Sequence, residues 1–195
     1  NGAATQVGNL SGQALQDLAY NPADGKMYGV NSVANVATLF EVDVNTGAVV
    51  AVGNFTGLPA TNLEVGLACD AQGNFYVHDI ASDGIFKGAG LALNPTPLYN
   101  AAQIGNTNFS QGMTIDWAGS GAGYHGAIGN SPAFFSELRT FNTGGGSYVI
   151  VGNFGTTTSQ FPTVETGDLA IAIPGPGAIS LLAVAGLISG RRRRN

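Results

Sequence analysis

The sequence predicts an all-β protein built from β-propeller-like repeats, each a sheet of four antiparallel strands. Two observations carry this prediction. Only 10% of the 195 residues are charged and 30 are glycine, a composition that suits short strands and tight turns better than exposed helices. The second observation is an internal repeat with a period typical of propeller blades.

The repeat is marked by the tripeptide Val-Gly-Asn or a near relative, which recurs at spacings of 45, 52 and 47 residues. The four copies are Val7–Asn9, Val52–Asn54, Ile104–Asn106 and Val151–Asn153. An apolar strand start follows each copy, at Asp17–Tyr20, Gly66–Asp70, Gly112–Asp116 and Gly167–Ala172. The shared phase predicts repeats over residues 11–55, 56–109 and 110–154, and the start of another over 167–172.

Tight turns divide each repeat into strands. Asp24-Gly25 and Asn45-Thr46-Gly47 separate alternating apolar runs in the first unit, and each supplies a glycine for a positive-φ position. Gln72-Gly73-Asn74 does the same in the second unit, and Asn142-Thr143-Gly144 in the third. Four strands in about 45 residues are typical of a propeller blade.

The β-branched and aromatic positions of these strands are predicted to fill the layers between blades, because a lone four-stranded sheet leaves both faces apolar. They are Tyr28, Val30, Phe40, Val42, Phe75, Val77, Phe141, Val149 and Val151, together with Trp117. The repeat aligns Tyr124 with Tyr28 and Tyr76, which predicts a structural role for Tyr124. Cys69 replaces Tyr20 in the repeat and is expected to be a small buried filler.

The count of blades leaves the closure of the ring open. Besides three whole units, we expect a last strand at Gln6–Leu10 and a first strand at Asp168–Ala172, about three and a half blades in all. Propellers typically close with at least four blades. The economical interpretation is that further blades and a leader precede this sequence in a longer protein. A β-sandwich or an open β-solenoid is the alternative for residues 1–172.

Charge is divided unevenly along the chain. Four of the seven basic residues lie in the last five positions, which leaves three basic residues against twelve acidic ones before Gly190. So acidic a surface repels phosphate backbones and disfavours nucleic-acid partners. Cys69 is the only cysteine, so the chain forms no internal disulfide.

Residues 173–195 form a distinct tail. Ala178–Ser189 is uncharged and would make a helix of about 18 Å, shorter than the roughly 20 residues of an ordinary membrane span. Pro174 and Pro176 precede it, and Arg191, Arg192, Arg193 and Arg194 follow it. The positive-inside rule would keep these arginines in the cytoplasm and the acidic body outside.

This three-part tail resembles the PEP-CTERM sorting signal of bacterial surface proteins. The resemblance covers about 22 residues and implies recognition, and cleavage near the proline motif, by a membrane-embedded exosortase. Pro174, Gly175, Pro176 and Gly177 would form the recognition box, although the family's usual glutamate is Gly175 here. Ala178–Ser189 would be the membrane segment and the arginines its stop. A plain C-terminal membrane anchor and a buried terminal strand are the alternatives.

No pattern in the body predicts a reaction. His78 lies near Asp70, Asp79 and Asp83, but the spacing fits no zinc motif, and His125 lies beside Tyr124. Asp43, Glu64 and Asp116 read as turn or strand-end residues. We therefore assign no catalytic residue, metal or cofactor.

The expected function is that of an exported, non-catalytic structural or adhesive protein of the cell envelope or extracellular matrix. Its expected partners are the membrane and an exosortase, and an extracellular polysaccharide, an association that the resemblance implies. A polysaccharide lyase or hydrolase on the same scaffold is the alternative.

Overall fold

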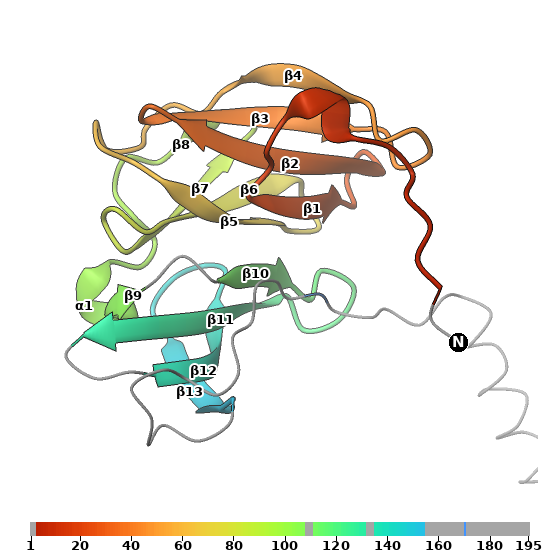
Figure 1. Cartoon of the computed structure of the whole chain (residues 1–195). Coiled ribbons are helices and arrows are strands. Elements are labelled where there is room, and N and C mark those ends of the chain that lie inside the picture. The colour runs from red at the N-terminus through yellow and green to blue at the C-terminus, as the bar shows by residue number, and fades with distance from the viewer. Residues whose placement is uncertain (1–2, 108–110, 132–134, 155–169, 171–195) are drawn as a thin grey trace, which may run out of the picture.

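The computed structural model describes residues 3–107, 111–131, 135–154 and 170. As predicted, the described chain is all-β, with three antiparallel sheets that follow one another along the sequence like propeller blades (Figure 1). We call these sheets the first, second and third blade.

Each blade is a meander in which neighbouring strands pair in chain order. The first blade contains β1 (Asp17–Asn21), β2 (Lys26–Val33), β3 (Val36–Val42) and β4 (Val49–Asn54). The second contains β5 (Glu64–Cys69), β6 (Asn74–Asp79), β7 (Gly84–Ala89) and β8 (Ala92–Leu93). The third contains β10 (Gly112–Ile115), β11 (Ala122–Ser131), β12 (Phe135–Asn142) and β13 (Tyr148–Asn153), with β9 (Asn106–Thr107) paired to β11. The short helix α1 (Ala101–Ile104) precedes β9.

The predicted turns of the first two blades lie where their glycines indicate, whereas in the third blade the positive φ belongs to Gly145 and Gly146 and not to Gly144. Gly25, Gly47 and Gly73 have φ of 74°, 68° and 80°, in the left-handed region that favours glycine. Each lies in the connection between two antiparallel strands, so the spacing of these glycines determines the lengths of the strands around them.

The second blade lies between the other two, and its inner strand β5 contacts both β1 and β10 (Figure 1). One apolar layer joins the first and second blades and includes Val30, Leu39 and Val77. Another joins the second and third blades and includes Tyr76, Tyr99 and Phe141. At the inner edge, the Asp17 carboxylate accepts a 2.6 Å hydrogen bond from the Leu67 N–H, which ties β1 to β5.

Equivalent positions of the inner strands meet different neighbours. Leu67 of β5 packs in the layer between the first and second blades, and Met113 of β10 packs in the layer between the second and third. The equivalent residue of β1, Leu18, is 44% exposed, and Tyr20 two residues further is 43% exposed. The first blade therefore leaves free the face that the later blades bury.

The tyrosine repeat keeps the predicted register. Tyr28, Tyr76 and Tyr124 stand opposite Ala19, Ala68 and Thr114, the same repeat position of each inner strand. Cys69 is buried, as predicted from its place in the repeat.

Most of the residues predicted to lie between blades are buried, but the prediction is wrong for Val149 and Val151. They lie on the outer strand β13 and are 51% and 57% exposed, because no described strand or sheet covers them. Phe40 and Val42 are buried, but the register places them on the free face of the first blade with Leu18 and Tyr20.

The predicted strand at Gln6–Leu10 is also wrong. The chain there is irregular and leads into a single 3-10 turn at Leu10–Gly12. Gly8 packs so closely on Thr46 and Gly47 that a side chain at position 8 would collide with their backbone. The segment thus covers a turn of the first blade. The predicted helix over Ala178–Ser189 lies outside the described residues.

Burial of the inner strands predicts a large stability difference between two single substitutions. Leu67→Ala removes a fully buried side chain between two blades and should lower the free energy of unfolding by about 3 kcal/mol. Val50→Ala, at a position 69% exposed, should change it by less than about 0.5 kcal/mol. Urea unfolding followed by circular dichroism measures both. Equal effects would contradict the stacked arrangement.

Candidate functional site

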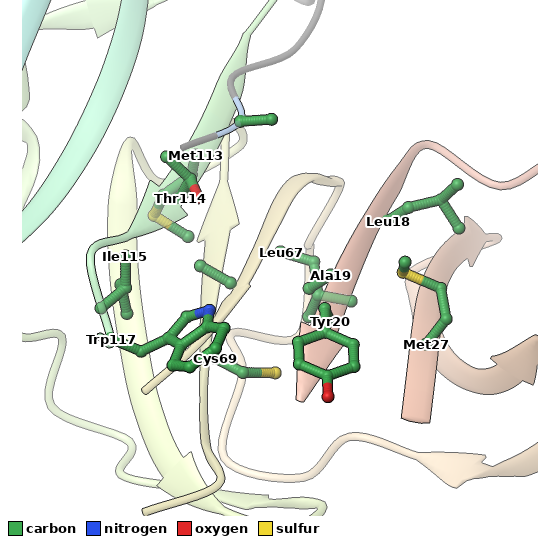
Figure 2. Close-up of a pocket in the computed structure, with 12 residues that line it drawn as sticks. Leu18, Ala19, Tyr20, Met27, Leu67, Cys69, Met113, Thr114, Ile115 and Trp117 are labelled. Carbon is green, nitrogen blue, oxygen red and sulfur yellow. The ribbon is translucent and has the colours of Figure 1, made fainter. Parts of the chain in front are cut away.

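The inner strands of the three blades surround a groove with a volume of about 270 Å³ (Figure 2). Its lining comes from Leu18 and Tyr20 of the first blade, Leu67 and Cys69 of the second, and Thr114 and Trp117 of the third, among others. The groove lies where the free face of the first blade has no other described blade against it. Ala170, the one described residue of the predicted repeat start at 167–172, also lines it.

Two aromatic rings face one another at one end of the groove. The centroids of Tyr20 and Trp117 are 5.8 Å apart and their planes are inclined by 42°. Figure 2 shows the Cys69 side chain at the same end of the groove. Trp117 lies two residues after the end of β10, in a turn closed by Asp116, and Tyr20 projects from the exposed side of β1. The pair therefore joins the first blade to the third across the opening.

The groove lining carries little acid–base chemistry. Among the described residues that line it, only Tyr20 and Cys69 have titratable side chains. Burial raises the pKa of the Cys69 thiol above its usual range, so the thiol stays protonated and is a poor nucleophile. A neutral lining with exposed aromatic faces is suited to binding an uncharged ligand.

A buried polar cluster, separate from the groove, lies between the second and third blades. His78 of β6 and His125 of β11 are both fully buried, and their ring centroids are 4.6 Å apart. Nε2–H of His125 donates to Oε1 of Gln111 at 2.8 Å, so Nδ1 carries the lone pair and accepts from the Tyr148 hydroxyl. Neither ring nitrogen of His78 has a hydrogen-bond partner in the described structure.

The two histidines are one position apart in the repeat. His78 stands opposite Gly66, whereas His125 stands opposite Met113, the next position along the inner strand. Neighbouring positions of a strand point to opposite faces. His78 therefore points toward the third blade, and His125 points back toward the second. This one-position offset in the repeat is the sequence signal from which the contact between His78 and His125 could have been predicted.

Burial holds both imidazoles in the neutral form. It lowers the pKa of His78 to about 3, and it lowers the pKa of His125 well below the usual value, with further contributions from His78 and Arg139. With no exposed surface, neither histidine is placed to exchange protons with a ligand in the groove.

Glu64 is fully buried at the start of β5, beside the Ser32 hydroxyl. Burial raises the pKa of Glu64 to about 7. A hydrogen bond from Ser32 opposes this shift, and the neighbouring Asp79 carboxylate adds to it. Sequence reasoning placed Glu64 correctly at a strand end but missed its burial.

The other acidic residues singled out in the sequence serve turns. Asp116 accepts hydrogen bonds from the backbone N–H and hydroxyl of Ser120, and these bonds lower its pKa. Asp43 accepts from the Asn45 N–H, and Asp79 accepts from the N–H groups of Leu63, Ala81 and Ser82. These carboxylates stabilise local backbone in the way predicted for Asp43 and Asp116.

The sorting motif Pro174–Gly177 and the arginines Arg191–Arg194 lie outside the described residues. Within the described part of the chain, no three or more His, Cys, Asp or Glu side chains are arranged to hold a metal ion. No helix of that part has the length and apolar character required to cross a membrane.

Comparison with known families identifies the repeat. The chain belongs to the family described as a repeat of unknown function (DUF6923), whose model matches residues 3–136. The match spans the first two blades and reaches the start of β12 in the third. A search of the curated proteins finds no match.

The buried titratable groups predict a pH dependence of stability. Between about pH 4.5 and 6.5 the unfolded chain protonates both histidines and the native chain protonates neither, while only the native chain protonates Glu64. The unfolded state thus binds about one more proton from these groups, so stability falls as the pH falls. Below pH 4.5 Glu64 is protonated in the unfolded chain as well. The unfolded state then binds about two more protons than the native state, until the histidines of the native state are protonated.

Two variants separate the contributions in urea titrations at several pH values. His78→Leu should flatten the pH dependence of stability between pH 4.5 and 6.5, because the unfolded state then binds one proton fewer while the native state binds the same number. Glu64→Gln should steepen it and should raise stability at pH 8, where the native chain must bury a charge. Slopes equal to that of the unmodified protein in both variants would contradict the assignment.

Proposed function

We propose that this protein is a non-catalytic structural or adhesive module of the cell surface or extracellular matrix, and that its groove binds an uncharged segment of extracellular polysaccharide. The observation that carries the binding site is the Tyr20–Trp117 pair at a neutral groove. The location and the tail's role rest on the resemblance of residues 173–195 to a sorting signal.

The chemistry of the groove supports a sugar ligand. The C–H face of a pyranose ring is apolar and packs on aromatic rings, while its hydroxyls seek polar partners at the edge. The Tyr20 and Thr114 hydroxyls can supply such partners. The lining carries no basic side chain among its described residues, so it offers nothing to neutralise an anionic sugar.

The alternative, a polysaccharide lyase or hydrolase, has less support from the structure. Such enzymes need an accessible acid or base beside the ligand. The groove offers only Tyr20 and Cys69 among its described lining, and the buried His78, His125 and Glu64 have no exposed surface. Non-catalytic binding is therefore the better proposal.

Substitution of the two aromatic residues tests the groove. Tyr20→Ala and Trp117→Ala should each weaken binding to a neutral polysaccharide by about tenfold or more, because each removes one stacking face. Tyr20→Phe keeps the aromatic ring and should lose less affinity for the polysaccharide. Affinity electrophoresis in gels containing single polysaccharides, neutral and anionic, measures the effect.

Val50→Ala, at an exposed position far from the groove lining, serves as a folded control. Equal retardation of the Tyr20→Ala variant and the unmodified protein in every retarding gel would contradict the proposed site. Preference for an anionic polysaccharide would contradict the ligand class.

The proposed delivery predicts a shortened mature protein. Intact mass spectrometry of the protein from its native host should give a C-terminus near Ile173–Gly177, where the sorting box lies. Replacement of Arg191–Arg194 by glutamine should leave the tail unprocessed, because the positive stop is lost. A mature mass that retains the four arginines would contradict sorting and leave a plain membrane anchor.

A further inference from the structure

Two fully buried carboxylates lie beside one another at the start of β5, in the second blade. Glu64 stands opposite Asp79 of β6, and both residues are 0% exposed. The three basic side chains of the described chain pair with other carboxylates, Lys26 with Glu41, Lys87 with Asp70 and Arg139 with Glu137. Adjacent buried carboxylates repel one another, so a proton or a cation has to balance their charge.

A β-bulge directs both carboxylates toward the first blade. The pairing of β5 with β6 shifts between Glu64 and Gly66, which makes Val65 the extra residue. Val77 of β6 packs in the layer between the first and second blades, and Asp79, two residues further, points to the same face. Glu64 stands opposite Asp79 and shares this face. Without the extra residue, Glu64 would point toward the third blade instead.

The first blade and the loop before β5 bring neutral oxygen atoms to the same place. The Ser32 hydroxyl, near the end of β2, donates a hydrogen bond to the Glu64 carboxylate. Asn62, two residues before Glu64, uses its side-chain Nδ2 to donate to the carbonyls of Asn35 and Pro59 at 3.0 and 2.8 Å. Asn35 lies in the turn after β2, so Asn62 meets the same end of the first blade as Glu64 does.

The side-chain oxygen of Asn62 is a buried acceptor without a donor. Asn62 is 8% exposed, and its Oδ1 has no hydrogen-bond partner in the described structure. The amide N–H groups serve Asn35 and Pro59, so the oxygen points away from those two carbonyls. Alternate residues of an extended chain share a face, which turns this oxygen toward the side of Glu64. A buried acceptor without a donor is unfavourable, and a cation satisfies it together with the carboxylate.

We propose that Glu64, Asn62 and Ser32 bind one calcium ion at this end of the layer between the first and second blades. Their carboxylate, amide and hydroxyl oxygens are hard ligands, the kind that Ca²⁺ takes in proteins. Asp79 supplies the second negative charge but no ligand atom, because its oxygens already accept four hydrogen bonds from the surrounding chain. The two carboxylates together balance the charge of the ion.

The surroundings favour calcium over magnesium. Mg²⁺ requires near-octahedral geometry and retains several of its waters, whereas Ca²⁺ accepts irregular sets of protein oxygens completed by water. Asn62 also lines an open pocket of about 320 Å³, which gives water and the ion access to this end of the layer. The site contains only two acidic residues and lies apart from the groove, whose lining includes none of its side chains.

Calcium titration of the metal-free full chain tests the site. At pH 8 in about 0.1 M KCl, urea unfolding should move to higher urea as calcium rises from about 0.1 to 10 mM, because only the native chain assembles the ligands. Magnesium at the same concentrations should move it less. Isothermal titration calorimetry should give one site per chain with a dissociation constant on the order of 0.1–1 mM, as expected for a site with few charged ligands.

Two variants that remove the same charge locate the effect. Glu64→Gln should lose the calcium-dependent shift, although in EDTA it should be at least as stable as the unmodified protein, because it buries no charge there. Asp43→Asn, in an exposed turn, should keep the full shift. Asn62→Ala, which removes a neutral ligand, should weaken calcium binding about tenfold.

Three results would count against this site. An unmodified protein whose unfolding does not respond to calcium overturns the proposal, since a shared proton alone then balances the two carboxylates. An equal calcium response of Glu64→Gln and Asp43→Asn overturns it as well. A larger response to magnesium than to calcium overturns the choice of ion.

Discussion

A four-stranded sheet with two apolar faces can bury a face only by lying against another sheet, and the other features of this protein depend on that constraint. The second blade has both faces covered, by the layer around Val77 on one side and Tyr76 on the other. Among the described blades, the first and the third each lie against one neighbour only. Their unmatched faces approach one another where Tyr20 meets Trp117, and the groove is the space between them.

The same stacking places the proposed binding groove and the buried polar residues in different parts of the molecule. The groove is lined partly by Leu18 and Tyr20, which no described blade covers, and partly by side chains such as Leu67 that are buried between blades. His78, His125 and Glu64 lie inside the array, where burial keeps the imidazoles neutral and favours the neutral carboxyl. Such groups cost stability when unpaired, and they influence the pH response of the fold.

The repeat predicted the fold because its markers coincide with physical requirements. Glycines at positive φ end the strands, and Tyr28, Tyr76 and Tyr124 recur at one register position. The exposure of Val149 and Val151 was not predictable, because the pattern of a strand does not say whether another blade covers it. Nor could the repeat place Gln6–Leu10, where packing of Gly8 on the turn at Gly47 replaces strand pairing.

The candidate site was less predictable than the fold. Tyr20 and Trp117 are nearly a hundred residues apart in the sequence and meet only because the array curves around β5. The histidine pair was in principle readable from the one-position offset between His78 and His125, but only once the direction of stacking was known. The tail, in contrast, was interpreted from its sequence alone.

The central claim is that stacking of the second blade between the other two holds the fold together, and native-state hydrogen exchange tests it most directly. The account predicts the slowest exchange for the backbone amides of β5 and β6, including Leu67 and Val77, which open only on global unfolding. The amides of β4 and β13 should exchange much faster through local opening. Three blades with equal protection, each opening independently of the others, would contradict the account.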